Sequence, residues 1–138
     1  MGAIYLHNAV WVLPALPELS ENMGYVAAAI QELGGTCQLI EGVCQLPGGR
    51  ERIEAEFREA ADERLEEISK SLDSVDEQLT GAASLKQLER AEEYLKRERI
   101  TYLRARRLSY FGSDYEPQIE AKLDALRQRL DGLHRTLK

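Results

Sequence analysis

A stripe of apolar residues at helical spacing dominates the middle of the sequence. From Arg50 onward these residues recur at intervals of three and four, as Ile53, Phe57, Ala61, Leu65, Ile68, Leu72, Val75 and Leu79. The spacing places them on one face of a continuous helix, which at 1.5 Å per residue would be about 45 Å long. A helix with so long an apolar face needs other helices to cover it.

Two further helical patterns follow this stripe. Residues 80–84 predict a turn, Ser84 predicts an N-cap, and the helix that it begins should end at Gly112. Ser113 and Glu116 then have capping-box spacing. The last apolar residues repeat at intervals of four, three, four, three and four, as Ile119, Leu123, Leu126, Leu130, Leu133 and Leu137. Three long helices joined by short turns pack as antiparallel neighbours, so we expect a three-helix bundle over residues 49–138.

The first 48 residues have a different pattern. Apolar residues alternate between residues 3 and 13, which predicts two short antiparallel strands with a tight turn near Asn8. Ser20 is a candidate N-cap of a helix that ends at Gly34 and Gly35. Residues 36–46 form a short apolar run bounded by glycines and a proline, which is typical of a buried strand. The sequence therefore predicts an α+β fold, predominantly helical, with a β-β-α-β unit over residues 1–48.

Charge and composition restrict what the chain can bind. A net charge of −6 and a pI near 5.0 argue against bulk electrostatic coating of nucleic acid or membrane, although a local basic patch stays open. No apolar run reaches the roughly 20 residues of a membrane span, and no signal peptide is recognisable, so we expect a cytoplasmic protein. Cys37 and Cys44 are expected to be buried strand residues without a disulfide. Neither a zinc-ligand pattern nor a GxSxG motif is present, so we expect no metal, cofactor or catalytic residue.

The best candidate site is a basic run in the second long helix. Residues 95–111 carry six positive side chains against one glutamate, interleaved with aromatic residues. Guanidinium groups bind a phosphate or a tetrahedral oxyanion through paired hydrogen bonds. The candidate DNA- or oxyanion-binding residues are Arg97, Arg99, Arg104, Arg106, Arg107, Tyr102 and Tyr110. The alternative is that these arginines pair with the acidic helix, because residues 51–79 hold eleven acidic side chains against four basic ones.

Four stretches carry a family resemblance. They are residues 2–14 (GAIYLHNAVWVLP), 31–36 (QELGGT), 54–60 (EAEFREA) and 104–112 (RARRLSYFG). These sequence segments resemble the N-terminal domain of ChrB, the chromate-resistance regulatory protein. The similarity spans nearly the whole chain. The resemblance implies a cytoplasmic bacterial protein that acts, without enzymatic activity, as a chromate-responsive transcriptional regulator. Its implied partners are an operator DNA and chromate or a similar oxyanion.

The resemblance also implies a partial ferredoxin-like unit. In the family a strand and a basic helix precede the residues that match Gly2 onward, and a separate C-terminal domain follows; we expect this sequence to lack all three. A sheet without its central strand and a regular last helix together predict a homodimer. Candidate residues for a dimer or core interface are Trp11, Leu126, Leu130 and Leu133. The alternative function is a helical dimerisation module that binds neither ligand nor DNA.

Overall fold

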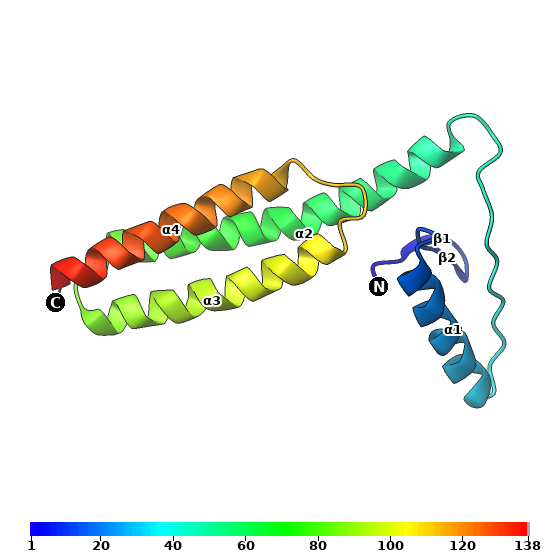
Figure 1. The fold of residues 1–138 in the computed structure, drawn as a ribbon, viewed down its shortest axis with the longest axis horizontal. Helices are drawn as coiled ribbons and strands as arrows, with labels where there is room; N and C mark the ends of the chain where they lie inside the picture. Colours follow the sequence, from blue (N-terminus) through cyan, green and yellow to red (C-terminus); the bar gives the residue numbers. More distant parts are fainter. Residues whose placement is uncertain (138) are drawn as a thin grey trace. The chain divides into compact units, whose positions relative to one another are not determined.

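The computed structural model describes residues 1–137 and is mostly helical, with a short β-hairpin followed by four helices (Figure 1). Backbone contacts divide the chain into two compact units, Met1–Glu56 and Phe57–Lys138. The first unit holds the hairpin, the first helix and the first eight residues of the second helix (Gly49–Thr80). The second unit holds the rest of that helix and two further long helices, and the three pack together, as the apolar stripe predicts.

The hairpin consists of strands β1 (Ile4–His7) and β2 (Val10–Val12), which pair antiparallel. Asn8 lies in the turn at a φ of 51°, in the left-handed region that asparagine tolerates better than most residues. Ile4 pairs with Val12, and its side chain is buried. The predicted hairpin and the predicted position of its turn are both confirmed.

The predicted strand at residues 36–46 is wrong. Within residues 1–137 the sheet contains β1 and β2 alone, so the expected β-β-α-β unit is a β-β-α unit. The apolar run favours extended backbone, but a strand also needs a neighbour to accept its hydrogen bonds, and this segment has none. Ile40 is 91% exposed. Cys37 is partly exposed and Cys44 fully exposed, so the expected burial of the cysteines is wrong as well.

Helix α1 (Pro17–Glu32) begins earlier than the sequence indicates. Leu16 occupies the N-cap position without a side-chain cap, and proline follows it at the first helical position. Proline suits that position because its missing N–H would be unpaired there anyway. Ser20 therefore lies inside the helix, and its expected capping role is wrong. The glycine stop is confirmed, because Gly34 has a φ of 85° and Gly35 N–H donates to the Ile30 carbonyl at 2.9 Å.

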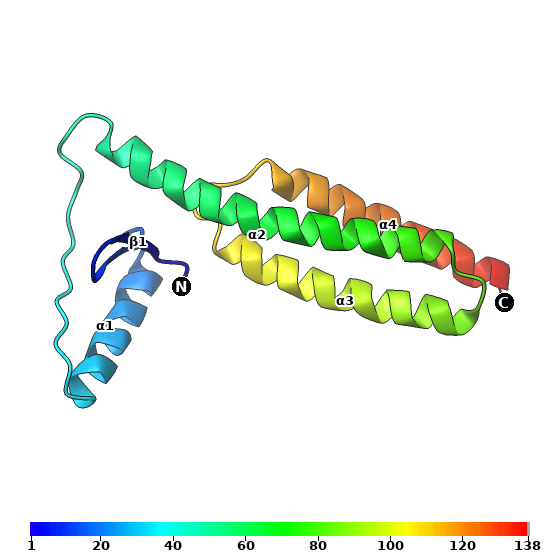
Figure 2. The same cartoon turned by 180° about the vertical axis from the view of Figure 1, so that it is seen from behind.

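The second unit is an antiparallel three-helix bundle. Helix α2 (Gly49–Thr80) runs antiparallel to α3 (Leu85–Arg107), and α3 runs antiparallel to α4 (Tyr115–Leu137), as both views show (Figures 1 and 2). One cluster of buried side chains joins the three helices; its largest fully buried members are Tyr102, Leu65, Leu72, Leu79, Leu88, Ile119 and Val75. The predicted helix order and the predicted antiparallel packing are confirmed.

Serine side chains accept backbone N–H groups at the N-terminal ends of α3 and α4. Ser84 caps α3, and its side-chain oxygen accepts the N–H of Gln87 at 3.3 Å, as expected. Helix α3 ends at Arg107, five residues before the glycine that should have ended it. Ser113 Oγ accepts the N–H of Tyr115 at 3.2 Å and donates to Asp62 Oδ1 on α2. The loop between α3 and α4 is therefore fixed to α2.

The apolar face of α4, with its regular leucine spacing, packs against other helices of the same chain. Leu126 and Leu130 are buried in the common core, and Leu133 packs against it. These three candidates for a dimer or core interface therefore belong to the core. Trp11, in contrast, is 58% exposed on the hairpin. The homodimer stays a prediction, but the seam of α4 no longer supports it, because α2 and α3 already cover that seam.

Candidate functional site

The helical period divides the candidate arginines of α3 between two faces. Arg97, Arg104 and Arg107 are exposed on one side, within roughly 80° of one another at 3.6 residues per turn. We call these three residues the outer stripe. Arg99 and Arg106 lie roughly 140–180° around the helix from Arg97 and Arg104, and they line a groove between α3 and α4. One basic run in the sequence thus becomes two separate surfaces.

The outer stripe keeps its charges unpaired. Within residues 1–137 none of its three guanidinium groups forms an ion pair. Two further exposed cations of α3 share this face: Arg90 lies seven residues before Arg97, and Lys86 lies eleven residues before it. The sequence interpretation missed them because they precede the dense basic run. The heptad spacing from Arg90 to Arg97 and Arg104 was the available signal.

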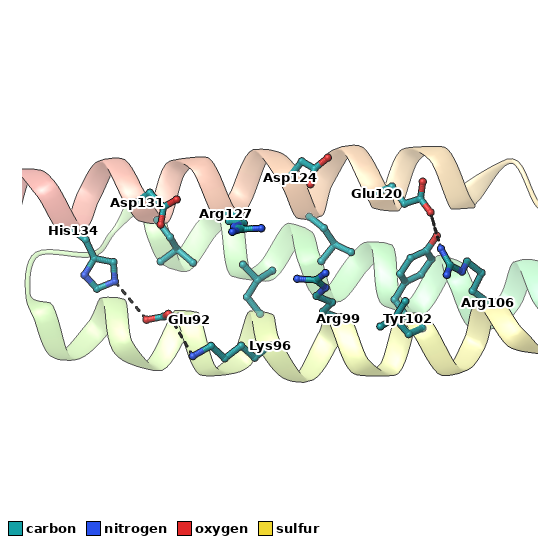
Figure 3. A pocket seen from close by; sticks show the side chains of 14 residues that line it. Glu92, Lys96, Arg99, Tyr102, Arg106, Glu120, Asp124, Arg127, Asp131 and His134 are labelled. Atoms are coloured by element: carbon teal, nitrogen blue, oxygen red, sulfur yellow. Dashed lines mark hydrogen bonds and ion pairs between the residues drawn. The ribbon is translucent and has the colours of Figure 1, made fainter.

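The groove between α3 and α4 has a volume of about 630 Å³ (Figure 3). Four leucines line it, Leu95 and Leu103 from α3 and Leu123 and Leu130 from α4. Charged side chains surround these apolar residues. The volume lies within the range of roughly 300–1,000 Å³ that is typical of small-molecule sites.

One end of the groove is closed by a hydrogen-bonded set. The Tyr102 hydroxyl donates to Glu120 Oε1 at 2.8 Å, and Arg106 Nη1 lies 3.3 Å from the same oxygen. The Arg106 guanidinium also sits 5.9 Å from the centre of the Tyr102 ring. Arg106 is therefore engaged by α4, and it is the one candidate arginine with a carboxylate partner among the described residues.

The other end of the groove is also paired. Glu92 Oε2 lies 3.6 Å from His134 Nε2, and Glu92 Oε1 lies 3.5 Å from Lys96 Nζ. The Glu92 carboxylate on α3 therefore faces a cation from its own helix and the imidazole from α4 (Figure 3).

Two arginines remain in the middle of the groove. Arg99 extends from α3 and Arg127 from α4, and both point into the groove from opposite sides (Figure 3). Neither forms an ion pair within residues 1–137. Arg127 was missed in the sequence because α4 mixes acidic and basic residues and has no basic run. No signal in one helix alone could have placed it opposite Arg99.

The alternative interpretation, pairing of the basic run with the acidic helix, finds no support among the described ion pairs. The acidic residues of α2 that form ion pairs with another helix pair with α4. Asp73 lies 2.8 Å from Lys122 Nζ, and Asp76 pairs with Arg129. Lys122 also donates to Ser69 Oγ at 2.7 Å. Charge complementarity in the bundle therefore joins α2 to α4 and leaves most cations of α3 free.

The two candidate tyrosines are used in packing. Tyr102 is 2% exposed in the core. The Tyr110 ring lies edge-on to Phe57 with the ring centres 6.0 Å apart, and Phe111 contacts the same ring at 5.6 Å. Both rings are therefore engaged by packing contacts within the bundle.

The buried Tyr102 predicts a pH dependence of stability. Burial, and then the hydrogen bond to Glu120, raise the pKa of Tyr102 from 10.0 to about 12. Between these values the unfolded chain loses the proton that the folded chain keeps, so the free energy of unfolding should fall as the pH rises, by about 1.4 kcal/mol per pH unit from this group. Urea unfolding between pH 9 and pH 12 measures the fall.

The matched control for this titration is Tyr102→Phe. The variant removes the ionising group and keeps the ring, so its stability should fall less steeply over the same pH range. Equal slopes for the two proteins would contradict the assignment to Tyr102, because lysines and other tyrosines titrate alike in both.

Other kinds of site receive no support from the described chain. Residues 1–137 contain no group of three or more histidine, cysteine, aspartate or glutamate side chains placed to hold a metal ion. None of the helices in that range has the length and apolar character needed to cross a membrane. The groove and the outer stripe are therefore the features on which a functional interpretation rests.

Comparison with known proteins identifies the family. The family model described as "Protein ChrB, N-terminal" matches residues 1–136, which is nearly the entire chain. No curated protein and no solved structure shows a significant match. The match agrees with the resemblance carried by the hairpin and by the basic end of α3. The chain belongs to the ChrB N-terminal domain family, which is linked to chromate resistance.

Proposed function

We propose that this chain is the N-terminal part of a non-enzymatic, chromate-responsive transcriptional regulator of a bacterial chromate-resistance operon. The observation that carries the proposal is the outer stripe of α3, where Arg97, Arg104 and Arg107 are exposed and unpaired among the described residues. Family membership supports the link to chromate resistance. The regulatory role is our inference from the stripe.

Electrostatics favour DNA backbone as the partner of the stripe. The chain as a whole is acidic, so its bulk field repels nucleic acid and only a local patch can attract it. The C-terminal half of α3 provides such a patch, because Glu98 is the one acidic residue between Leu95 and Arg107. Arginines that neutralise phosphates release counterions, which makes binding strong at low salt and weak at high salt.

An electrophoretic mobility shift assay on operator DNA tests the proposal. The wild-type chain should shift the DNA at low salt, and the triple variant R97A/R104A/R107A should shift it only at much higher protein concentrations. Each phosphate contact contributes about 0.9 to the slope of log K against log salt, so the variant's slope should be shallower by about 2.7. A titration over several salt concentrations measures this difference.

A second triple variant serves as the matched control. R58A/K70A/R135A removes three exposed cations from α2 and α4 and changes the net charge equally. It should shift DNA as the wild type does, apart from a small uniform loss. If the wild type fails to shift DNA at low salt, or if the two triple variants behave alike, the outer stripe is not a DNA-binding surface.

A helical dimerisation module is the second candidate, and the hairpin favours it. Tyr5 and Trp11 pair across the strands with ring centres 5.1 Å apart, and both side chains are exposed. Exposed aromatic side chains are enriched where proteins meet other proteins. The candidate is compatible with a homodimer that meets through the hairpin.

A further inference from the structure

We propose that Arg99 and Arg127 form a clamp for a small tetrahedral dianion in the groove between α3 and α4. The inference rests on the proposed function in one respect: it names the place where a chromate-responsive protein would take up its anion. The clamp is separate from the outer stripe, because Arg99 faces the opposite side of α3 from Arg97 and Arg104. Arg127 belongs to another helix altogether.

The geometry of the two arginines carries the proposal. They point into the same groove from opposite helices, and neither has a carboxylate partner within residues 1–137 (Figure 3). Two guanidinium groups that face each other repel, and an anion placed between them converts this repulsion into two attractive contacts. Each guanidinium can donate two parallel hydrogen bonds to an oxyanion.

The groove lining carries four acidic and four basic side chains, and the two carboxylates at its ends are already engaged. Glu92 is engaged by Lys96 and His134 at one end, and Glu120 by Arg106 and Tyr102 at the other. Two aspartates of α4 also line the groove. Asp124 lies at the outer edge of that helix, on the side away from Arg99, and Asp131 lies between Arg127 and His134 (Figure 3).

The two guanidinium groups indicate which class of anion would bind in the groove. Two guanidinium groups can donate hydrogen bonds to several oxygen atoms of one tetrahedral oxyanion, whereas chloride offers a single atom. Sulfate, hydrogen phosphate and chromate share the required chemistry of tetrahedral oxygen atoms around a small centre.

Isothermal titration calorimetry on the whole chain tests the clamp, with sulfate as the first probe in sodium chloride of matched ionic strength. Sulfate should bind with a stoichiometry of one. The variants R99Q and R127Q should each weaken binding about tenfold or more, because each loses a charge-assisted pair of hydrogen bonds. The control R135Q removes an exposed arginine of α4 that does not line the groove, and it should bind as the wild type does.

Titrations with other anions and a check of folding complete the experiment. Chromate and phosphate titrations compare the sources of the anion: binding of any of the three that depends on both arginines supports the clamp. Circular dichroism of R99Q and R127Q should match the wild type, and R127K, which keeps the charge, should retain part of the affinity and so separates loss of binding from misfolding. No heat of binding with any of the three anions, or full affinity in both glutamine variants, overturns the proposal.

The clamp and the outer stripe can fail separately. The triple variant of the outer stripe should still bind sulfate, since none of its residues lines the groove. The clamp variants should still shift DNA in the absence of the anion. A chain that binds sulfate but not DNA would therefore refute the proposed function and leave the clamp standing, and the opposite result would refute the clamp alone.

Discussion

Replacement of Leu126 by alanine is expected to lower the free energy of unfolding of the bundle by about 2–5 kcal/mol. Leu126 is 4% exposed and belongs to the cluster that joins the three long helices. Its loss removes buried apolar area and leaves a cavity between helices that cannot fully close. Urea unfolding followed by circular dichroism measures the change.

This substitution also decides between core and interface. If Leu126 lies in the core of each monomer, L126A should unfold at lower urea at every protein concentration. Trp11→Ala is the comparison, because Trp11 is the exposed candidate interface residue. W11A should leave the midpoint of unfolding nearly unchanged while converting any homodimer to monomer in light scattering. If L126A instead abolished a dimer and left monomer stability unchanged, the assignment of Leu126 to the core would be wrong.

Phe57→Ala is expected to cost about 3–5 kcal/mol, the range for a buried phenylalanine. Phe57 is 4% exposed on α2, and its ring contacts both aromatic rings of the loop between α3 and α4. Edge-on and tilted ring pairs add about 0.5–1.5 kcal/mol beyond the area that they bury. The variant should therefore loosen the loop that joins the two helices lining the groove.

Tyr94→Ala is the matched control for this prediction. Tyr94 is an aromatic residue of the same bundle, but it is 37% exposed on α3. Its removal should cost clearly less than that of Phe57 in the same urea experiment. Equal losses would mean that the cluster of Phe57, Tyr110 and Phe111 does not fix the loop.

The two surfaces of α3 explain why the paired and unpaired arginines differ in role. Arg106 is bound to Glu120 and helps to hold α3 against α4. The arginines of the outer stripe form no ion pair among the described residues, and Arg99 points into the groove that Arg127 also lines. Unpaired arginines are free to bind an external anion, whether DNA phosphate or a small dianion. The proposals thus rest on charges that the bundle itself does not use.

The sequence determined the local features of this protein. The apolar repeats predicted the three long helices, because side chains three and four residues apart meet on one helical face. Ser84 predicted the start of α3, and Asn8 predicted the turn of the hairpin, since each effect depends on one residue and its near neighbours.

The tertiary structure alone decided the features that depend on distant residues. The composition of residues 36–46 favours a strand, but no neighbouring strand is present to pair with it. The seam of α4 fits a second chain as well as it fits α2 and α3, and only the packing shows that Leu126 and Leu130 are covered from within. Arg127 faces Arg99 because α4 turns back along α3. Periodicity fixes which residues share a face of one helix, whereas the residue opposite that face is set by how the helices pack.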